Sequence, residues 1–224
     1  MRKIYKQREC VLLDMESKLY LIRHGHTFFN LEDRLGGDSG LTSKGKEHAE
    51  KIARWLSEFE LNVIYCSLLK RSIQTAEIVS KYHPDTPLIK VPELVEISSG
   101  DMDSLTYAEF EEKFPDLFEA RKKDKYHWAF PNGESYETAR ERARPFLDGL
   151  KSKEGDFVII GHQGMNRIIL GYLLDLSKKE IPYLVIQNNV IFEIDLNNSN
   201  VCSIKDGQRV EGYVVDEDMK KADV

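Results

Sequence analysis

Short apolar runs alternate with helical patterns along most of this chain, and this alternation strongly limits the folds it can adopt. The runs at 19–22, 63–66, 88–91, 157–160 and 190–194 have the length of strands. The run at 157–160 is continuously apolar, which is typical of a central parallel strand covered on both faces. Strands that alternate with helices predict an α/β protein, here a three-layer α/β/α fold with a mostly parallel central sheet.

Helical patterns fill most of the intervals between these runs. Thr42 and Ser135 each precede such a pattern, and both residue types are good N-caps. Pro115 interrupts one pattern because proline removes a backbone donor from a helix. The expected helices cover 42–56, 70–80, 106–114, 135 to about 150, and 165–174.

The 224 residues contain no internal repeat, low-complexity tract or flexible linker, so we expect one domain over 18–224. Residues 1–17 show no clear pattern and are interpreted as an N-terminal extension. The net charge of −6 argues against non-specific binding to nucleic acid. It does not argue against an anionic substrate, because a local basic pocket can form in an acidic protein.

The three cysteines, Cys10, Cys66 and Cys202, are far apart and odd in number, which indicates free thiols in a reducing compartment. None of them has zinc-like spacing. No apolar stretch is long enough to span a membrane, and 1–17 lacks the apolar core of a signal peptide. We therefore expect a cytoplasmic protein with no membrane partner, no metal and no cofactor.

The tripeptide Arg23-His24-Gly25 directly follows the first apolar run. In open α/β proteins, ligands bind where parallel strands end. An imidazole at such a position can act as a nucleophile, and a neighbouring guanidinium suits a phosphate group. The tripeptide therefore suggests phosphoryl transfer through a phosphohistidine on His24.

Other residues at strand or helix ends complete this chemistry. Arg71 opens the helix after 63–66, His162 follows 157–160, and Asn30 offers an amide a few residues after His24. Phosphoryl transfer mainly requires neutralisation of the charge on the phosphate oxygens, which such side chains supply. Glu96 is the expected proton donor for the leaving oxygen, and the same group would then activate water.

Each of these residues also has a structural interpretation. Arg71 and His162 can be ordinary helix and core residues, and Glu93, Asp101 and Asp103 compete with Glu96 for the acid role. The pair His24 and His26 can suggest a metal chelate, but no Asp, Glu or Cys set accompanies it. The segment 40–46 differs from a nucleotide-binding P-loop motif by one residue, because Glu47 stands where a Ser or Thr should hold magnesium.

Taken together, these motifs resemble the histidine phosphatase superfamily, the phosphoglycerate-mutase-like fold. The matching segments are Arg23-His24-Gly25, Leu41-Thr42-x-x-Gly45, Arg71-Ser72-x-Gln74-Thr75-Ala76, Glu96 and His162. The resemblance runs from about residue 18 to residue 195. It implies a His24 nucleophile, a phosphate surrounded by Arg23, Arg71 and His162, and Glu96 as proton donor.

Within that superfamily, several segments are similar to the bisphosphatase domain of 6-phosphofructo-2-kinase/fructose-2,6-bisphosphatase. They include 36–41, which contains Gly37, and also 131–136, 161–163 and 173–184. This similarity implies a set that holds a second phosphate and the sugar: Tyr107, Arg121, Lys125, Tyr136, Gln163 and Arg167. The alternative for Arg121 and Lys125 is a solvated basic run.

The expected function is that of a metal-independent phosphatase for a small phosphorylated metabolite, with fructose 2,6-bisphosphate favoured. A bisphosphoglycerate-dependent mutase is the alternative enzyme. Mutase relatives carry a long insertion between the acid and the segment matching Gly133-Glu134-Ser135, and here that interval is short. A non-catalytic phosphate-sensing module is the remaining alternative, but the nucleophile and the arginines are all present.

Overall fold

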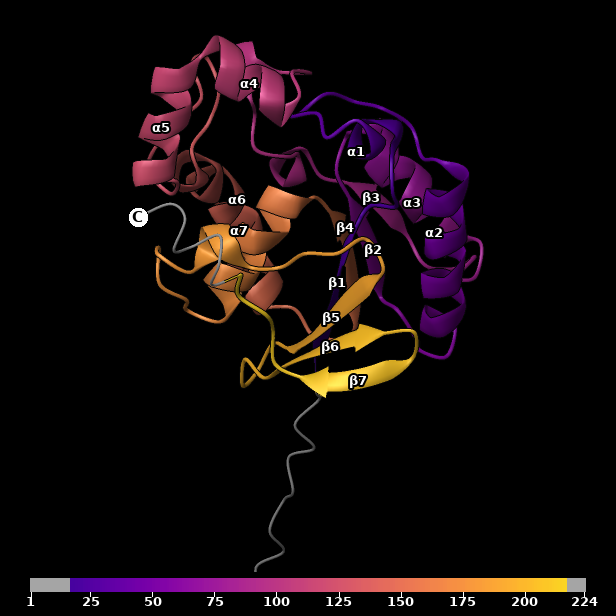
Figure 1. Cartoon of the computed structure of the whole chain (residues 1–224). Coiled ribbons are helices and arrows are strands. Elements are labelled where there is room, and N and C mark those ends of the chain that lie inside the picture. The colour runs from indigo at the N-terminus through magenta and orange to yellow at the C-terminus, as the bar shows by residue number, and fades with distance from the viewer. Residues whose placement is uncertain (1–16, 217–224) are drawn as a thin grey trace, which may run out of the picture.

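Seven strands form one mixed sheet in the order β3-β2-β4-β1-β5-β6-β7 (Figure 1). The computed structural model describes residues 17–216, so Cys10 and all but the last residue of the expected N-terminal extension lie outside the described residues. Strands β1 to β4 pair in parallel, and β5 to β7 continue the sheet antiparallel. The strands are β1 (Lys18–Arg23), β2 (Val63–Cys66), β3 (Leu88–Lys90), β4 (Phe157–Gly161), β5 (Val190–Asp195), β6 (Val201–Lys205) and β7 (Gln208–Glu211).

Helices cover both faces of the parallel half of the sheet (Figure 1). Alternate side chains of β1 point to opposite faces, so Leu19 and Leu21 join one core cluster while Tyr20 and Ile22 join the other. The expected three-layer α/β architecture is therefore confirmed. One layer contains α2 (Ser43–Leu56) and α3 (Lys70–Ser80), and the other contains α6 (Tyr136–Lys151) and α7 (Gln163–Leu173).

Two short helices, α4 (Tyr107–Lys113) and α5 (Pro115–Lys123), lie apart from these layers, at the top of Figure 1. A separate small core holds them, built from Leu35, Met102 and Phe110. The remaining elements are short: α1 (Phe28–Leu31) and the 3-10 turns η1 (Pro92–Leu94), η2 (Gly100–Met102) and η3 (Ile181–Tyr183). No helix within residues 17–216 combines the length and apolar character needed to cross a membrane.

The two helix starts predicted at Thr42 and Ser135 are confirmed by their caps, whereas the helix predicted from 165 begins at Gln163. The Thr42 hydroxyl accepts a hydrogen bond from the Gly45 N–H, and the Ser135 hydroxyl accepts one from the Thr138 N–H. The pattern over 106–114 does stop before Pro115. The same proline then begins α5, a helix that was not predicted. Proline is tolerated there because the backbone N–H that it lacks would have no partner in the first helical turn.

The hairpin of β6 and β7 was also not predicted. Strand β7 is fully exposed, so it shows no alternation of apolar and polar residues. Its signal lies in the turn, where Asp206 and Gly207 both adopt positive φ values of 49° and 78°. An Asp-Gly pair of this kind is typical of a two-residue hairpin turn.

Candidate active site

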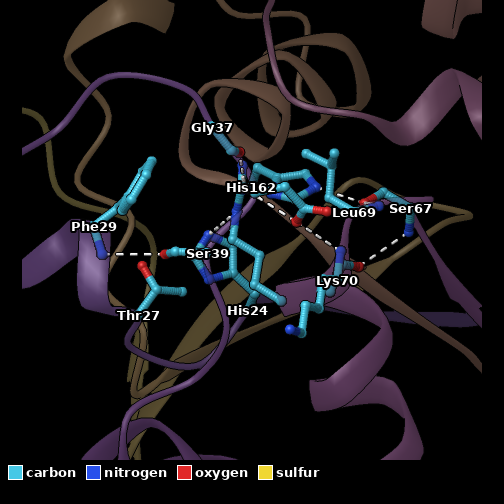
Figure 2. Close-up of polar contacts among 12 residues, drawn as sticks. His24, Thr27, Phe29, Gly37, Ser39, Ser67, Leu69, Lys70 and His162 are labelled. Carbon is cyan, nitrogen blue, oxygen red and sulfur yellow. Dashed lines mark hydrogen bonds and ion pairs between the residues drawn. The ribbon is translucent and has the colours of Figure 1, made fainter. Parts of the chain in front are cut away.

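A pocket of about 400 Å³ lies at the carboxyl ends of the central parallel strands and reaches under α4 and α5. His24 leaves β1 at this edge, and its backbone N–H donates to the Gly161 carbonyl at the end of β4, at 3.0 Å. The parallel register thus brings His24 and His162 together, and the two ring centroids are 5.2 Å apart (Figure 2).

The His24 ring has a defined orientation. Its Nδ1 lies 2.8 Å from the Gly25 carbonyl, which can only accept a hydrogen bond, so Nδ1 carries the proton. Its Nε2 carries the ring's in-plane lone pair, which accepts a hydrogen bond from Arg71 Nε at 3.1 Å. Burial, and then the charges of Arg71 and Arg23, hold the pKa of His24 well below its ordinary value. His24 is therefore a neutral imidazole, the form that can act as a nucleophile.

Two arginines, the buried Arg71 and the partly buried Arg23, supply positive charge beside this ring. Arg71 donates to the Gly37 carbonyl at 2.5 Å, and one guanidinium nitrogen lies 3.8 Å from the Asp38 carboxylate. Arg23 donates to the Ile186 carbonyl at 3.0 Å, whereas its Nε is buried without a protein partner within residues 17–216. Burial lowers the pKa of Arg23 to about 10, which leaves it charged at neutral pH.

Helix α3 fastens the loops around the pocket through consecutive polar side chains. The Gln74 side chain accepts the Leu41 N–H at 2.9 Å, and the Thr75 hydroxyl accepts the Gly25 N–H at 2.9 Å. Gly25 itself packs so tightly that a Cβ there would lie 2.4 Å from the Gly45 carbonyl oxygen. The polar motif of this helix therefore positions the segment that carries His24.

His162 follows β4 and is fully buried at the start of α7. Burial lowers its pKa well below the ordinary value, with the charge of Arg71 next in importance. His162 is not among the residues that line the pocket, and its ring lies beside that of His24. Its Nε2 contacts the Ser67 hydroxyl at 2.6 Å.

Of the four acids that competed for the proton-donor role, Glu96 is the one that lines the pocket. Its carboxylate accepts the backbone N–H groups of Gly164 at 3.0 Å and Met165 at 2.9 Å, at the N-terminus of α7. Asp101 instead accepts the Asn132 side-chain amide, and Asp103 accepts the Gly37 N–H at 2.7 Å. Glu96 is thus the acid of that segment placed to reach a bound substrate.

An ion pair anchors the segment that carries Glu96. Arg142 on α6 donates to the Glu134 carboxylate at 2.8 Å and to the Val95 carbonyl at 3.3 Å. Glu134 in turn accepts the Ser98 N–H at 3.0 Å. These contacts hold both sides of Glu96 against α6.

The pocket also brings together the residues expected at the second phosphate. Arg121 on α5 lies between the rings of Tyr107 and Phe130, at 5.9 and 5.6 Å from their centroids. Lys125 is only 7 % exposed and lies 4.6 Å from the Tyr183 ring centroid, so it is not part of a solvated run. Tyr107, Arg121, Lys125, Tyr136, Gln163 and Arg167 all line the pocket.

The remaining two predicted residues have structural partners. Asn30 lines the pocket, and its side-chain oxygen accepts the Thr27 N–H at 3.1 Å, which leaves its NH₂ group for another acceptor. Gly37 does not line the pocket. Its carbonyl binds Arg71 and its N–H binds Asp103, and a Cβ there would lie 2.2 Å from the Phe29 ring.

Asn188 and Ser67 are among the polar residues of this site that the sequence did not indicate. Asn188, in the loop before β5, donates its side-chain amide to the His24 carbonyl at 2.6 Å and lines the pocket. Ser67, which follows β2, contacts His162. Ser67 directly follows a strand, the same position that identified His24, whereas Asn188 lies in the loop two residues before β5. Among residues 17–216, no group of three or more His, Cys, Asp or Glu side chains is arranged to hold a metal ion.

The family model of the histidine phosphatase superfamily, branch 1, matches residues 19–204. The chain belongs to the histidine phosphatase superfamily. Among its relatives, 6-phosphofructo-2-kinase/fructose-2,6-bisphosphatase 1 of Mus musculus is 38 % identical over 168 residues. That match covers 74 % of this chain and 34 % of the relative, so the chain spans about a third of the length of this curated protein.

Solved structures confirm that the fold is that of histidine phosphatases. A putative alpha-ribazole-5'-P phosphatase from Escherichia coli has a TM-score of 0.75 at 20 % identity, with 90 % of this chain and 97 % of that chain covered. A mycobacterial glucosyl-3-phosphoglycerate phosphatase in complex with VO3 has a TM-score of 0.73 at 24 % identity, with 88 % and 97 % covered. Family membership supports a phosphatase that acts on a phosphorylated substrate.

Proposed function

We propose that this histidine phosphatase hydrolyses a small phosphorylated metabolite through a phosphohistidine on His24. The observation that carries the proposal is the His24 ring itself. Its proton is held on Nδ1 by Gly25 and it is neutral, so Nε2 carries the lone pair, which accepts a hydrogen bond from Arg71 in a pocket lined by Arg23 and Arg71 and would exchange that contact for phosphorus. Those two guanidinium groups can neutralise the phosphate oxygens during transfer.

In the first step, His24 Nε2 forms a bond to phosphorus while the bond from phosphorus to the leaving oxygen breaks. Glu96, as the general acid, gives its proton to that oxygen. In the second step, water attacks the phosphohistidine and transfers a proton to Glu96. The nitrogen–phosphorus bond breaks, which releases inorganic phosphate and restores neutral His24.

We further infer that the favoured substrate is fructose 2,6-bisphosphate or a similar sugar phosphate. The support is the second cation group in the pocket, Arg121, Lys125 and Arg167, together with the 38 % identity to a bifunctional bisphosphatase. A guanidinium or ammonium group at hydrogen-bond distance suits a second phosphate.

A phosphate-release screen over sugar monophosphates and bisphosphates tests this function, with and without a chelator. We expect release that is largest for fructose 2,6-bisphosphate, unchanged by the chelator, and abolished by His24→Ala. The exposed His127→Ala is the matched control and should retain activity. Interconversion of phosphoglycerates without net phosphate release would favour the mutase instead, and full activity in His24→Ala would overturn the mechanism.

A further inference from the structure

The two nitrogens of the buried His162 ring have different surroundings. Nε2 lies 2.6 Å from the Ser67 hydroxyl, as the dashed contacts of Figure 2 show. Nδ1 is buried and has no hydrogen-bond partner among residues 17–216. Because the ring lies beside His24, a phosphate transferred to His24 would be the nearest new acceptor for a proton on Nδ1.

The hydrogen bonds of Ser67 determine which nitrogen carries the proton. A serine hydroxyl has one proton to donate and two lone pairs that accept. The Ser67 oxygen already accepts the Leu69 backbone N–H at 3.2 Å, and His162 Nε2 is its other contact in the described part of the chain. If Nε2 carried the proton, the buried hydroxyl proton would have no acceptor, which is costly. The hydroxyl therefore donates to Nε2, and the proton of neutral His162 is on Nδ1.

The position of Ser67 is fixed independently of His162. Ser67 is fully buried, and its backbone N–H donates to the Ser72 hydroxyl at 3.0 Å. Ser72 donates in turn to the Ile160 carbonyl on β4 at 2.6 Å. Strand β4 leads directly into His162, so the same short network holds both the hydroxyl and the ring.

We propose that Ser67 is a positioning residue, which holds His162 in the tautomer whose Nδ1–H donates to a phosphate oxygen at His24. This inference rests on the proposed function of the site. Both histidines then carry the proton on Nδ1, with opposite uses: His24 directs a lone pair at phosphorus, and His162 directs an N–H at oxygen. Gly25 sets the first tautomer and Ser67 sets the second.

Nitrogen-15 NMR of the unliganded protein tests the tautomer directly. The spectrum should show His162 as a neutral ring with a protonated Nδ1 and a bare Nε2, assigned by the resonances that disappear in His162→Gln. A protonated Nε2 would overturn the proposal. The measurement needs no turnover and no Ser67 variant, so its outcome is separate from that of the phosphatase function.

A double-mutant cycle tests whether Ser67 acts through His162, with binding of orthovanadate as the readout. Loss of one hydrogen bond of about 1 kcal/mol corresponds to roughly a fivefold to tenfold rise in the dissociation constant of vanadate. Ser67→Ala should weaken vanadate binding by about that factor in the wild type, but by less than about twofold in a His162→Ala background. Ser80→Ala, an exposed hydroxyl at the end of α3, is the control and should bind vanadate as the wild type does. Equal losses in the two backgrounds, or no loss in either, would contradict the proposal.

Discussion

At the scale of single residues, the site works by keeping two histidines neutral among cations. Burial and the neighbouring guanidinium groups lower the pKa of both His24 and His162. A proton on either ring would therefore be unfavourable before substrate arrives. The anionic phosphate changes this balance, because it offsets the positive charge of Arg23 and Arg71.

Replacement of the proposed acid tests its role at the same scale. Glu96→Gln should lower kcat for a sugar phosphate by about 100- to 10,000-fold with little effect on binding, because the group moves a proton in the transition state. The loss should be much smaller for p-nitrophenyl phosphate, whose leaving oxygen needs no proton. Steady-state kinetics with both substrates measures the difference.

Asp101→Asn is the matched control for Glu96→Gln, because Asp101 lies in the same segment and binds Asn132 outside the pocket. It should leave both rates close to those of the wild type. An equal loss for the two substrates in Glu96→Gln would assign the proton transfer to another group.

Individual site residues differed in how far the sequence could predict them. His24, Arg71 and Glu96 stand in recognisable motifs at predicted strand or helix ends, and the structure places all three at one pocket. Ser67 contacts His162, and Asn188 contacts His24, through hydrogen bonds between residues 95 and 164 positions apart in the sequence. No local pattern reports such a contact.

At the scale of elements, α5 adds cationic side chains to a pocket that is otherwise built at strand ends. The helix begins at Pro115 and carries Arg121 into the pocket, with Lys125 just beyond its end. Both cations were expected at the second phosphate because of the resemblance to the bisphosphatase domain, although no helix was predicted there. Helix α5 has no buried residue, so its sequence lacks the strong apolar periodicity that would have predicted a helix.

Removal of the two cations of this element tests the second phosphate site. Arg121→Ala/Lys125→Ala should lower kcat/KM for fructose 2,6-bisphosphate by roughly 10- to 100-fold per lost contact, since a charged hydrogen bond contributes about 1.5–3 kcal/mol. Hydrolysis of p-nitrophenyl phosphate, which has no second phosphate, should change little.

The neighbouring pair Lys122→Ala/Lys123→Ala is the control, because these lysines belong to the same basic run but do not line the pocket. It should hydrolyse both substrates as the wild type does. If the Arg121/Lys125 variant also retained full activity on the bisphosphate, the pocket would bind only one phosphate.

At the scale of the whole molecule, the sheet divides into two halves with different tasks. The pocket residues come from the ends of parallel strands β1, β2 and β4 and the loops around them, whereas no residue from β5 to the end of the described chain lines it. Strands β1, β2 and β4 of the parallel half were predictable because they are largely buried and apolar. The hairpin of β6 and β7 was not, since β6 is only partly buried and β7 is exposed along its whole length.

The pH dependence of the free energy of unfolding should show the lowered pKa values of the two histidines. An unfolded chain takes up protons on histidine near pH 6.5, whereas the folded protein resists this because the pKa values of His24 and His162 are lowered. The free energy of unfolding should therefore fall as pH drops below about 6.5, by up to about 1.4 kcal/mol per pH unit for each such histidine. Urea unfolding between pH 7.5 and 5.5 measures this slope.

His162→Gln should make that slope shallower than in the wild type by about the contribution of one histidine. The other histidines are present in both proteins, so their contributions cancel in the comparison. An unchanged slope in His162→Gln would contradict a lowered pKa of this ring in the folded protein.

Alkaline quench of a single turnover tests the central claim most directly. The enzyme is mixed with a substrate labelled with phosphorus-32, quenched within milliseconds, and digested for peptide mapping under alkaline conditions that preserve phosphohistidine. We predict a transient, acid-labile phosphate on the peptide that contains His24, at up to one label per active site and absent from His24→Ala. Steady hydrolysis without any label on His24, or label on another residue, would contradict the account.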